Sequence, residues 1–458
     1  MMTENNFYEL PKNWVWTKIR AITELIKGVT YEKQEASKEA KQGYAPILRA
    51  NNISDKINYD ELVYVPCNRV KEEQYIIKYD ILLAMSSGSK HLVGKAAQVL
   101  NDFDGGFGAF CGLIRVSGEI NKKIIGYFFK SSNYRQMISK LSSGVNINNL
   151  RREHIESIPI PIPPLPEQHR IIAKIEELFS DLDAGVEALK KAKAQLRLYR
   201  QAVLKAAFEG RLTAAWREAH KNFSEIQMGW IRVKLGDFIE PSNERVNPTL
   251  LQKVPYIGLE HIKKGTGRLL GSGSSDEVRS TKSRFFRGDL LYGKLRPYLN
   301  KVLIAEFDGV CSTDILVFPK SPHVSMKFLA HRFLCNDFVR YASLNVSGVQ
   351  HPRVDFLTLS KFIISLPPLP EQMIVVQEIE HRFSIIDDLE KTVEDSLRHS
   401  DRLRQGILKK AFAGELVPQD PEDEPAEKLL ERIKGEKAGH DTGKKPGRRA
   451  AQRDLNYG

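Results

Sequence analysis

The strongest constraint on the fold of this chain is an internal repeat. Residues 163–168 read PPLPEQ, and residues 367–372 read PPLPEQ again, at an offset of 204. The match continues without a gap to residue 213 and its counterpart at 417, with about 19 identities in 51 pairs. Repeats are considered first because a missed repeat misassigns the whole fold. The chain is therefore expected to be a tandem duplication.

The regions before the two PPLPEQ blocks are related more faintly. Ser143-Gly144-Val145 resembles Ser347-Gly348-Val349 at the same offset, and KYDILLAM (78–85) resembles RGDLLYGK (287–294). One order of segments therefore occurs twice, followed by a tail. The expected segments are a first globular domain at 1–160, a first conserved helix at 161–213, a linker and second globular domain at 214–366, a second conserved helix at 367–417 and a tail at 418–458.

Each conserved segment has the pattern of a long helix. Prolines pre-set an entry turn, and Glu167 and Glu371 then fall where the helix dipole favours an anion. Gly210 and Gly414 fit helix stops. Apolar residues recur at steps of mostly three and four: Ile171, Ile175, Leu178, Leu182, Val186, Leu189, Leu196, Tyr199 and Val203, then Val375, Ile379, Phe383, Ile386, Leu389, Val393, Leu397, Leu403 and Ile407.

Two such helices suggest how the duplication is held together. A helix of about 40 residues is roughly 60 Å long and needs a partner for its apolar stripe. The other copy is the obvious partner, and an antiparallel coiled coil follows if the duplication folds about a pseudo-twofold axis. The alternative is that each helix packs on its own domain.

The two globular domains look mixed. Gly, Asn and Ser turns separate short β-rich runs, and longer amphipathic segments follow these runs. The runs lie at 81–85, 111–116, 301–307 and 314–318, and the expected helices lie at 118–141 and 323–344. The predicted fold class is α+β, with two globular α/β domains joined by the two long helices.

Charge and composition narrow the choice of partner. The 458 residues include 69 Lys and Arg against 57 Asp and Glu, a formal net charge of +12. Such a balance favours an anionic partner such as nucleic acid, although a plain surplus of surface lysine is the alternative. No run of 18 apolar residues and no export signal is present, so no membrane is expected.

The cysteines and the tail add two expectations. Cys67, Cys111, Cys311 and Cys335 show no metal-site spacing, which indicates buried thiols in a reducing, cytoplasmic setting. In the tail, the acidic DPEDEP (420–425) is interpreted as solvated, a short helix is possible just after it, and the residues from 438 on have too little to bury and are expected to be disordered.

Motifs for catalysis are absent from the sequence. There is no phosphate-binding G-x-x-x-x-G-K-[ST] loop, and Asn247-Pro248 is followed by threonine, so the Asn-Pro-Pro-aromatic motif of amino-methyltransferases is missing. No acidic cluster suggests a two-metal nuclease, and no histidine makes an obvious triad or metal site. The sequence therefore predicts a binding protein without a cofactor of its own.

These residues together resemble a known family. The repeated PPLPEQ, followed by I-x-x-x-I-E, F-S and L-K-x-A-F-x-G-x-L, is similar to the specificity subunit of type I restriction–modification systems. The resemblance implies two target-recognition domains that contact double-stranded DNA and helices that dock two methylation subunits. It also implies that S-adenosylmethionine, used to methylate adenine, belongs to those subunits, and that ATP and Mg belong to restriction subunits that translocate and cleave DNA.

Two different recognition domains on one spacer should read a split, asymmetric site. If both approach one face of the duplex, their centres lie about one turn apart, roughly 10 base pairs, which leaves an unread gap of roughly 5–8. Polar loops are the candidate contacts, because Asn can pair with adenine, Arg with guanine, and hydroxyls and cations with phosphate.

The candidate DNA-binding residues fall into corresponding loops of the two domains. The alternatives are a plain turn for the serine loop, turn capping for Arg49, Asn51 and Asn52, and ordinary loop polarity for the region of Glu260 and His261. The first domain offers Arg49, Asn51, Asn52, Ser86, Ser87, Ser89, Lys90, Asn146, Asn148, Asn149 and Arg151, and the second offers Glu260, His261, Lys294, Arg296, Tyr298, His351 and Arg353. On the helices, Arg200, Lys205, Arg404 and Lys409 are expected to be solvated or to face a partner rather than to read bases.

Three other readings remain open at this point. The repeated P-x-x-P could mark a scaffold that binds only proteins. An autonomous enzyme could use a site without a sequence signature. A methylation system without a restriction subunit would use the same chain.

Overall fold

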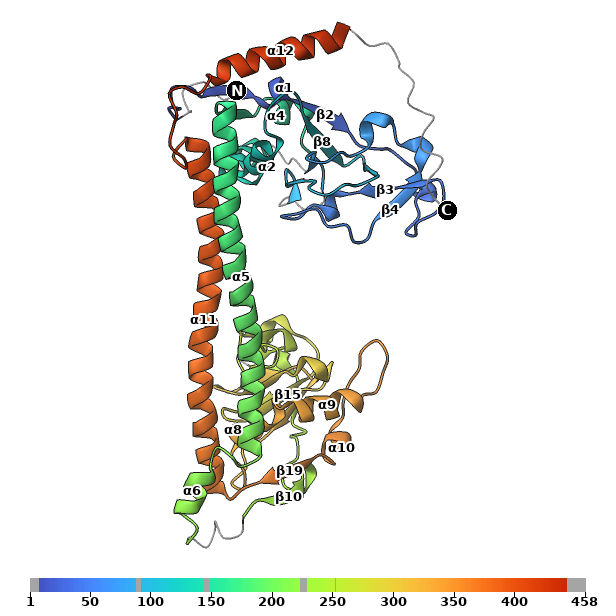
Figure 1. Cartoon of the computed structure of the whole chain (residues 1–458). Coiled ribbons are helices and arrows are strands. Elements are labelled where there is room, and N and C mark those ends of the chain that lie inside the picture. Colours follow the sequence, from blue (N-terminus) through green and yellow to red (C-terminus); the bar gives the residue numbers. More distant parts are fainter. Residues whose placement is uncertain (1–7, 88–91, 143–148, 223–228, 252, 443–458) are drawn as a thin grey trace. The chain divides into compact units, whose positions relative to one another are not determined.

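The computed structural model describes residues 8–87, 92–142, 149–222, 229–251 and 253–442. The chain divides into two compact units (Figure 1): unit 1 contains residues 1–187 and 397–458, and unit 2 contains residues 188–396. Two long helices, α5 (Leu165–Phe208) and α11 (Leu369–Ala413), are shared between them. The two units have the same plan.

Unit 1 is built on a four-stranded sheet in the order β2-β8-β5-β6 and a three-stranded sheet in the order β4-β3-β7, with a β1–β9 pair. Its strands are β1 (Val15–Lys18), β2 (Thr23–Lys27), β3 (Tyr44–Leu48), β4 (Val63–Pro66), β5 (Ile81–Ala84), β6 (Ala96–Gln98), β7 (Gly106–Phe107), β8 (Cys111–Val116) and β9 (Pro159–Ile162). Its own helices are α1 (Ile19–Ile22), α2 (Lys122–Lys130), α3 (Ser132–Ser142), α4 (Arg152–Glu156) and α12 (Ala426–Thr442).

Unit 2 has a three-stranded sheet in the order β16-β15-β18 and a five-stranded sheet in the order β11-β14-β17-β12-β13, with a β10–β19 pair. Its strands are β10 (Ile231–Lys234), β11 (Arg245–Val246), β12 (Pro255–Ile257), β13 (Gly273–Ser274), β14 (Lys282–Phe285), β15 (Leu290–Gly293), β16 (Val302–Ile304), β17 (Gly309–Cys311), β18 (Ile315–Phe318) and β19 (Ile363–Leu366). Its helices are α6 (Ala214–Ala219), α8 (Met326–Phe333), α9 (Asn336–Leu344) and α10 (Phe356–Leu359). The predicted α+β fold class is confirmed.

The expected helices at 118–141 and 323–344 are each two helices, which corrects the sequence interpretation. The break in the first lies at Ser131, whose backbone is extended (ψ 152°). Its hydroxyl donates to the Phe128 carbonyl (2.7 Å) and accepts from the Tyr134 amide (3.3 Å), so it ends one helix and starts the next. Cys335 takes the same extended conformation (ψ 142°) between α8 and α9.

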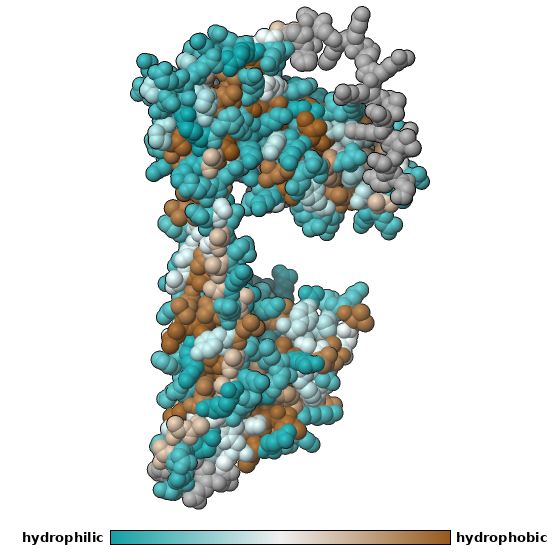
Figure 2. All heavy atoms as spheres, viewed as in Figure 1, coloured by the Kyte–Doolittle hydropathy of each residue, from teal (hydrophilic) through white to brown (hydrophobic). Residues whose placement is uncertain are grey.

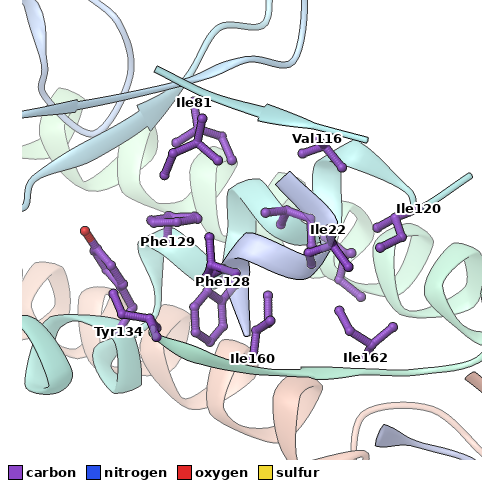
Figure 3. Close-up of a cluster of buried hydrophobic side chains, with 14 of the residues drawn as sticks. Ile22, Ile81, Val116, Ile120, Phe128, Phe129, Tyr134, Ile160 and Ile162 are labelled. Atoms are coloured by element: carbon purple, nitrogen blue, oxygen red, sulfur yellow. The ribbon is translucent and has the colours of Figure 1, made fainter. Parts of the chain in front are cut away.

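A single hydrophobic core joins the unit 1 sheet to the long helices. Figure 3 shows side chains from the sheet, from α2, from α3 and from β9 pointing into one cluster. The labelled members are Ile22, Ile81, Val116, Ile120, Phe128, Phe129, Tyr134, Ile160 and Ile162. The same core takes Ile171 and Ile175 from α5 and Leu408 and Phe412 from α11. In Figure 2, hydrophilic residues predominate on the visible face of this unit.

The two long helices pack antiparallel in each unit, as predicted. In unit 1, Arg404 of α11 pairs with Asp183 of α5 (2.6 Å) and covers the Phe179 ring. In unit 2 the partners are exchanged: Arg200 of α5 pairs with Asp387 of α11 (2.6 Å) and covers the Phe383 ring.

Some sequence expectations for the helices need correction. Arg200 and Arg404 are engaged within the chain instead of being solvated, whereas Lys205 and Lys409 are exposed. Tyr199, Leu389 and Leu403 were assigned to the apolar stripe but are 53 %, 48 % and 43 % exposed. A spacing of three and four residues fixes a helix face only roughly, and these three lie at its edge.

The PPLPEQ motif anchors each long helix to its domain. The buried Gln168 side chain accepts from the Asn121 amide at the start of α2 (2.9 Å) and donates to the Pro163 carbonyl (2.9 Å). Gln372 makes the same two bonds, to the Ser325 amide (2.8 Å) and the Pro367 carbonyl (2.9 Å). The motif is therefore structural at both positions.

Burial of the motif also bears on the scaffold reading. Pro163, Pro164 and Pro367 are buried, so the repeated P-x-x-P does not present a free ligand for an SH3-type module. Glu167 and Glu371 are buried as well. Glu167 accepts from Trp14 Nε1 (2.9 Å), and burial raises the pKa of this carboxyl. Glu167 therefore holds its domain to the helix start, whereas Glu371 accepts from Thr213 (2.7 Å) and Arg217 (2.6 Å) just after α5.

A second pair of glutamines secures the far end of each helix. Gln201 of α5 donates to the Leu334 carbonyl (3.2 Å) at the end of α8, and Gln405 of α11 donates to the Lys130 carbonyl (3.3 Å) at the end of α2. Both helices stop at the predicted glycines, because Gly210 and Gly414 have positive φ (71° and 74°).

The beginning of the tail is folded, which corrects the expectation that its acidic segment is solvated. Asp423 is 9 % exposed and pairs with Arg170 of α5 (2.6 Å). The helix predicted after it exists as α12 and continues to Thr442. Leu429, Leu430 and Ile433 of α12 are buried in the unit 1 core. The rest of the tail lies outside the described residues.

Candidate nucleic-acid interface

Two of the predicted loops of the first domain meet in unit 1. Ser86 forms a β-bridge with Asn149, and the Leu150 amide donates to the Met85 carbonyl (2.7 Å). The amides of Met85 and Ser86 both donate to the carbonyl of Phe110 (3.0 and 3.1 Å). Candidate residues more than 60 positions apart in the sequence are thus neighbours.

The Arg49 loop joins the same surface. The Gly108 amide, two residues before Phe110, donates to the Leu48 carbonyl (2.9 Å) at the end of β3. The loops that follow strands β3, β5 and β7 therefore lie against one another. We call this surface the first loop ring, which consists of residues 48–52, 85–87, 108–110 and 149–151.

Unit 2 repeats most of these bonds. Leu295 bridges to Arg353, and the Val354 amide donates to the Lys294 carbonyl (3.1 Å). The Lys294 amide donates to the Asp314 carbonyl (2.9 Å). The Ser312 amide donates to the Ile257 carbonyl (3.0 Å), as Gly108 does to Leu48. We call residues 257–261, 294–298, 312–314 and 351–354 the second loop ring.

The rings share a backbone but differ in side chains. By these equivalent bonds, Phe110 of the first loop ring corresponds to Asp314 of the second, Ser86 to Leu295, and Asn149 to Arg353. The first loop ring thus has a phenyl group, a hydroxyl and an amide at the positions where the second loop ring has a carboxylate, an aliphatic chain and a guanidinium. One scaffold therefore presents two different chemical surfaces.

The Asn52 and His261 side chains hold turns instead of facing solvent. Asn52 is 1 % exposed; its Oδ1 accepts from the Arg49 amide (2.9 Å), and its Nδ2 donates to the carbonyls of Asn58 and Asp60. His261 Nδ1 accepts from the Gly258 amide (2.9 Å) in the same kind of turn. These bonds favour the turn-capping alternative for Asn52, and they give His261 the same role in its turn.

The remaining candidates of the first domain differ in accessibility. Asn51, Asn149 and Arg151 are exposed, and Arg49 is half-buried with one guanidinium nitrogen donating to the Glu61 carbonyl (3.2 Å). Ser86 and Ser87 are half-buried in the first loop ring. Four candidates lie outside the described residues: Ser89, Lys90, Asn146 and Asn148.

Basic side chains and a tyrosine line the second loop ring. Arg296 is exposed and takes a left-handed backbone conformation (φ 51°), and Tyr298 is 50 % exposed. Lys294 is half-buried, while Glu260 and His351 are exposed. The Arg353 guanidinium is held by Asp314 (2.8 and 3.2 Å) and lowers the pKa of this carboxyl. Arg353 therefore braces the ring as well as lining it.

Sequence reasoning missed two members of the rings. Phe110 is 70 % exposed beside Ser86, and Asp314 fixes Arg353. The two residues lie 204 positions apart, which is the offset of the repeat, and each is next to a short strand that the sequence pattern located. An alignment of the two halves could have marked this position as equivalent, but not as part of a loop ring.

The described ranges contain neither a metal-site cluster nor a membrane-spanning helix. There, no group of three or more His, Cys, Asp or Glu residues could hold a metal ion. No helix in these ranges has the length and apolar character needed to cross a bilayer. Cys67 is exposed, contrary to the prediction of four buried thiols, and burial raises the pKa of Cys111, Cys311 and Cys335 to about 12.

The chain is similar to known proteins over most of its length. Residues 11–196 and 228–399 match the family model described as the type I restriction modification DNA specificity domain. The chain is 34 % identical to the type I restriction enzyme EcoKI specificity subunit of Escherichia coli K12, over 96 % of this chain and 99 % of that one. It is 35 % identical to the StySPI specificity subunit of Salmonella potsdam, over 97 % and 99 %.

A solved structure has the same fold. It comes from a study titled as the structural basis of complex assembly and conformational transition of the type I R-M system, and it matches with a TM-score of 0.62 at 18 % identity over 89 % of this chain and all of that one. The duplicated loop rings, the repeated motif and the family match agree with one another. The chain therefore belongs to the type I restriction–modification specificity family, whose members are the DNA specificity subunits of these systems.

Proposed function

We propose that each loop ring reads one half of a split, asymmetric double-stranded DNA site. The observation that carries this proposal is the repetition of one backbone ring with different side chains. A common backbone supplies a common docking geometry, whereas Phe110, Ser86 and Asn149 against Asp314, Leu295 and Arg353 supply different contacts. Two loop rings with different side chains on one chain should recognise two different half-sites.

The side chains suit a division between positioning and reading. Arg296 and Tyr298, both accessible, can grip a phosphate and a sugar, and Arg151 can do so in the first loop ring. Asn51 and Asn149 are exposed amides that can pair with adenine. Shape readout adds specificity at bases that no side chain touches. We therefore propose these exposed residues as the first contacts to test.

We also propose that the long helices dock two methylation subunits. Exposed apolar side chains on the helices support this: Leu198 is 72 % and Ile385 50 % exposed in unit 2, and Leu403 is 43 % exposed in unit 1. Apolar groups left open on long helices suit burial by a partner. Adenine methylation would then be carried out by those subunits, and ATP-driven translocation and cleavage by restriction subunits.

The test is a map of methylated adenines in cells. The chain is co-expressed with the methylation subunit from the same gene cluster, and modified bases are located by single-molecule sequencing. A two-part motif with an unread gap of roughly 5–8 base pairs is expected, and it should vanish when this chain is omitted. Replacing residues 214–366 with the domain of a relative should change one half of the motif only. A change in both halves, or methylation that is independent of the chain, contradicts the proposal.

A further inference from the structure

One exposed segment of unit 2 is not explained by folding. The connection between α9 and α10 projects from its unit (Figure 1). Residues 345–351 are all exposed, and Val349 is 100 % exposed, whereas Val354 at the base is fully buried. A fully exposed valine contributes nothing to the core, so folding does not account for its apolar side chain.

The segment is a defined hairpin. Ser347 and Arg353 exchange backbone hydrogen bonds, with amide-to-carbonyl distances of 2.8 and 2.9 Å. Gly348 has a φ of 85°, which allows the tight turn at the tip. Asp314 holds the Arg353 side chain and so fixes the base of the hairpin. Its tip, Val349 and Gln350, is therefore presented on a supported stem.

The hairpin belongs to the second loop ring. The Arg296 amide donates to the Pro352 carbonyl (2.7 Å), so the hairpin base adjoins the exposed Arg296 and Tyr298. A lone exposed apolar residue is ordinary on a protein surface. Here, however, the apolar tip adjoins the exposed Arg296 and Tyr298 on the loop ring proposed to face DNA, and this position favours a contact with DNA.

We propose that this hairpin enters the major groove and recognises an A·T pair in the half-site of the second domain. Val349 packs on the 5-methyl group of thymine, and the amide of Gln350 pairs with N6 and N7 of an adenine. Valine offers the apolar surface that a thymine methyl requires, and glutamine offers the donor and acceptor that adenine presents in that groove. The inference rests on the proposed function and specifies which pair the second domain reads.

The sequence adds an independent pointer. Ser-Gly-Val recurs at 143–145, at the offset of 204, and is followed by Asn-Ile-Asn-Asn where the second copy has Gln-His-Pro-Arg. The shared triplet is not needed for any core contact of the described hairpin, and the residues after it differ. A shared triplet followed by divergent residues suits a segment that makes one common contact and several specific ones. Residues 143–148 lie outside the described residues.

The test uses the whole chain assembled with its methylation subunits and the motif found in the methylation map. In the second half-site, each thymine is replaced in turn by deoxyuridine, which lacks only the 5-methyl group. Binding of the unaltered protein should weaken about five-fold at one position. Val349→Ala should weaken binding to normal DNA by a similar factor and show no further loss with deoxyuridine there, as a coupled pair requires.

Matched variants separate this contact from general damage. Leu250 is 83 % exposed in the same unit but outside the second loop ring, so Leu250→Ala should leave binding unchanged. Gln350→Ala should relax the choice of base at one position of the second half of the methylated motif and leave the first half intact. Since both tip residues are exposed, thermal midpoints should not move.

Three outcomes would overturn the inference. They are a second half-site without an A·T pair, additive losses from deoxyuridine and Val349→Ala, and unchanged DNA affinity combined with weaker assembly of the methylation subunits, which would place a protein on the hairpin. The proposed function would survive all three, because it fails only if methylation is independent of this chain or if a domain exchange changes both halves of the motif.

Discussion

The buried glutamine of the second PPLPEQ motif offers a quantitative test of what the motif does. Gln372 is 1 % exposed, accepts from the Ser325 amide at 2.8 Å and donates to the Pro367 carbonyl at 2.9 Å. Gln372→Ala leaves both backbone groups without a partner. Each such group costs about 1–3 kcal/mol, so the unfolding free energy of unit 2 should fall by roughly 3 kcal/mol.

The assay must report on each unit separately, because a chain with two units need not unfold in one step. Hydrogen exchange followed by mass spectrometry does so, since peptides from α8 and the first half of α11 report on unit 2. Protection there should drop by about two orders of magnitude, at 1.4 kcal/mol per factor of ten, while unit 1 peptides stay unchanged. Gln168→Ala should show the mirror result, because Gln168 makes the same two bonds.

The control is Gln377→Ala, which truncates an exposed glutamine on the same helix. It should leave protection unchanged. If Gln372→Ala costs no more than Gln377→Ala, the two hydrogen bonds do not hold the helix start. The structural reason given for the repeated motif is then wrong.

Three further predictions concern stability. Arg200→Ala should cost about 2 kcal/mol and Arg404→Ala about 1, because the Arg200 side chain is 12 % exposed and that of Arg404 29 %; equal costs in urea unfolding would contradict this. Burial lowers the pKa of His331 from its usual 6.5 to about 4. The unfolded chain therefore binds the extra proton first, and unit 2 should keep its full stability above pH 6.5 and lose up to roughly 3 kcal/mol towards pH 4. His331→Phe should flatten this part of the stability profile. Deleting residues 418–458 removes four buried side chains of α12, and it should lower the unfolding free energy of unit 1 by about 5 kcal/mol and increase binding of an apolar dye; an unchanged thermal midpoint would contradict it.

The duplication made much of the fold predictable. A repeat of PPLPEQ followed by a helical pattern located both long helices, and the glycines at 210 and 414 marked their ends. The antiparallel pairing followed from the need to bury two similar stripes. What the pattern could not show is how each helix is divided between two units, since Arg200 finds Asp387 and Arg404 finds Asp183 only in three dimensions.

Local signals failed where a distant partner decides the outcome. The acidic segment of the tail looks solvated because nothing nearby in the sequence pairs with Asp423, whose partner Arg170 lies 253 residues away. Asn52 looked like a reader of bases because polar loop residues can either read or cap, and the choice depends on the carbonyls of Asn58 and Asp60. At the interface, residue types could be predicted, but their burial could not.

The glutamine bonds have a consequence for how such chains acquire new specificities. At each end of each helix, a glutamine of the internal repeat bonds to a main-chain atom of a domain: the Asn121 amide or the Lys130 carbonyl in unit 1, and the Ser325 amide or the Leu334 carbonyl in unit 2. Every amino acid offers the main-chain carbonyl, and every one except proline offers the amide. Recombination between genes at the PPLPEQ sequence therefore keeps these hydrogen bonds with a domain of unrelated surface, and only the apolar contacts between the helices and the core of that domain have to match.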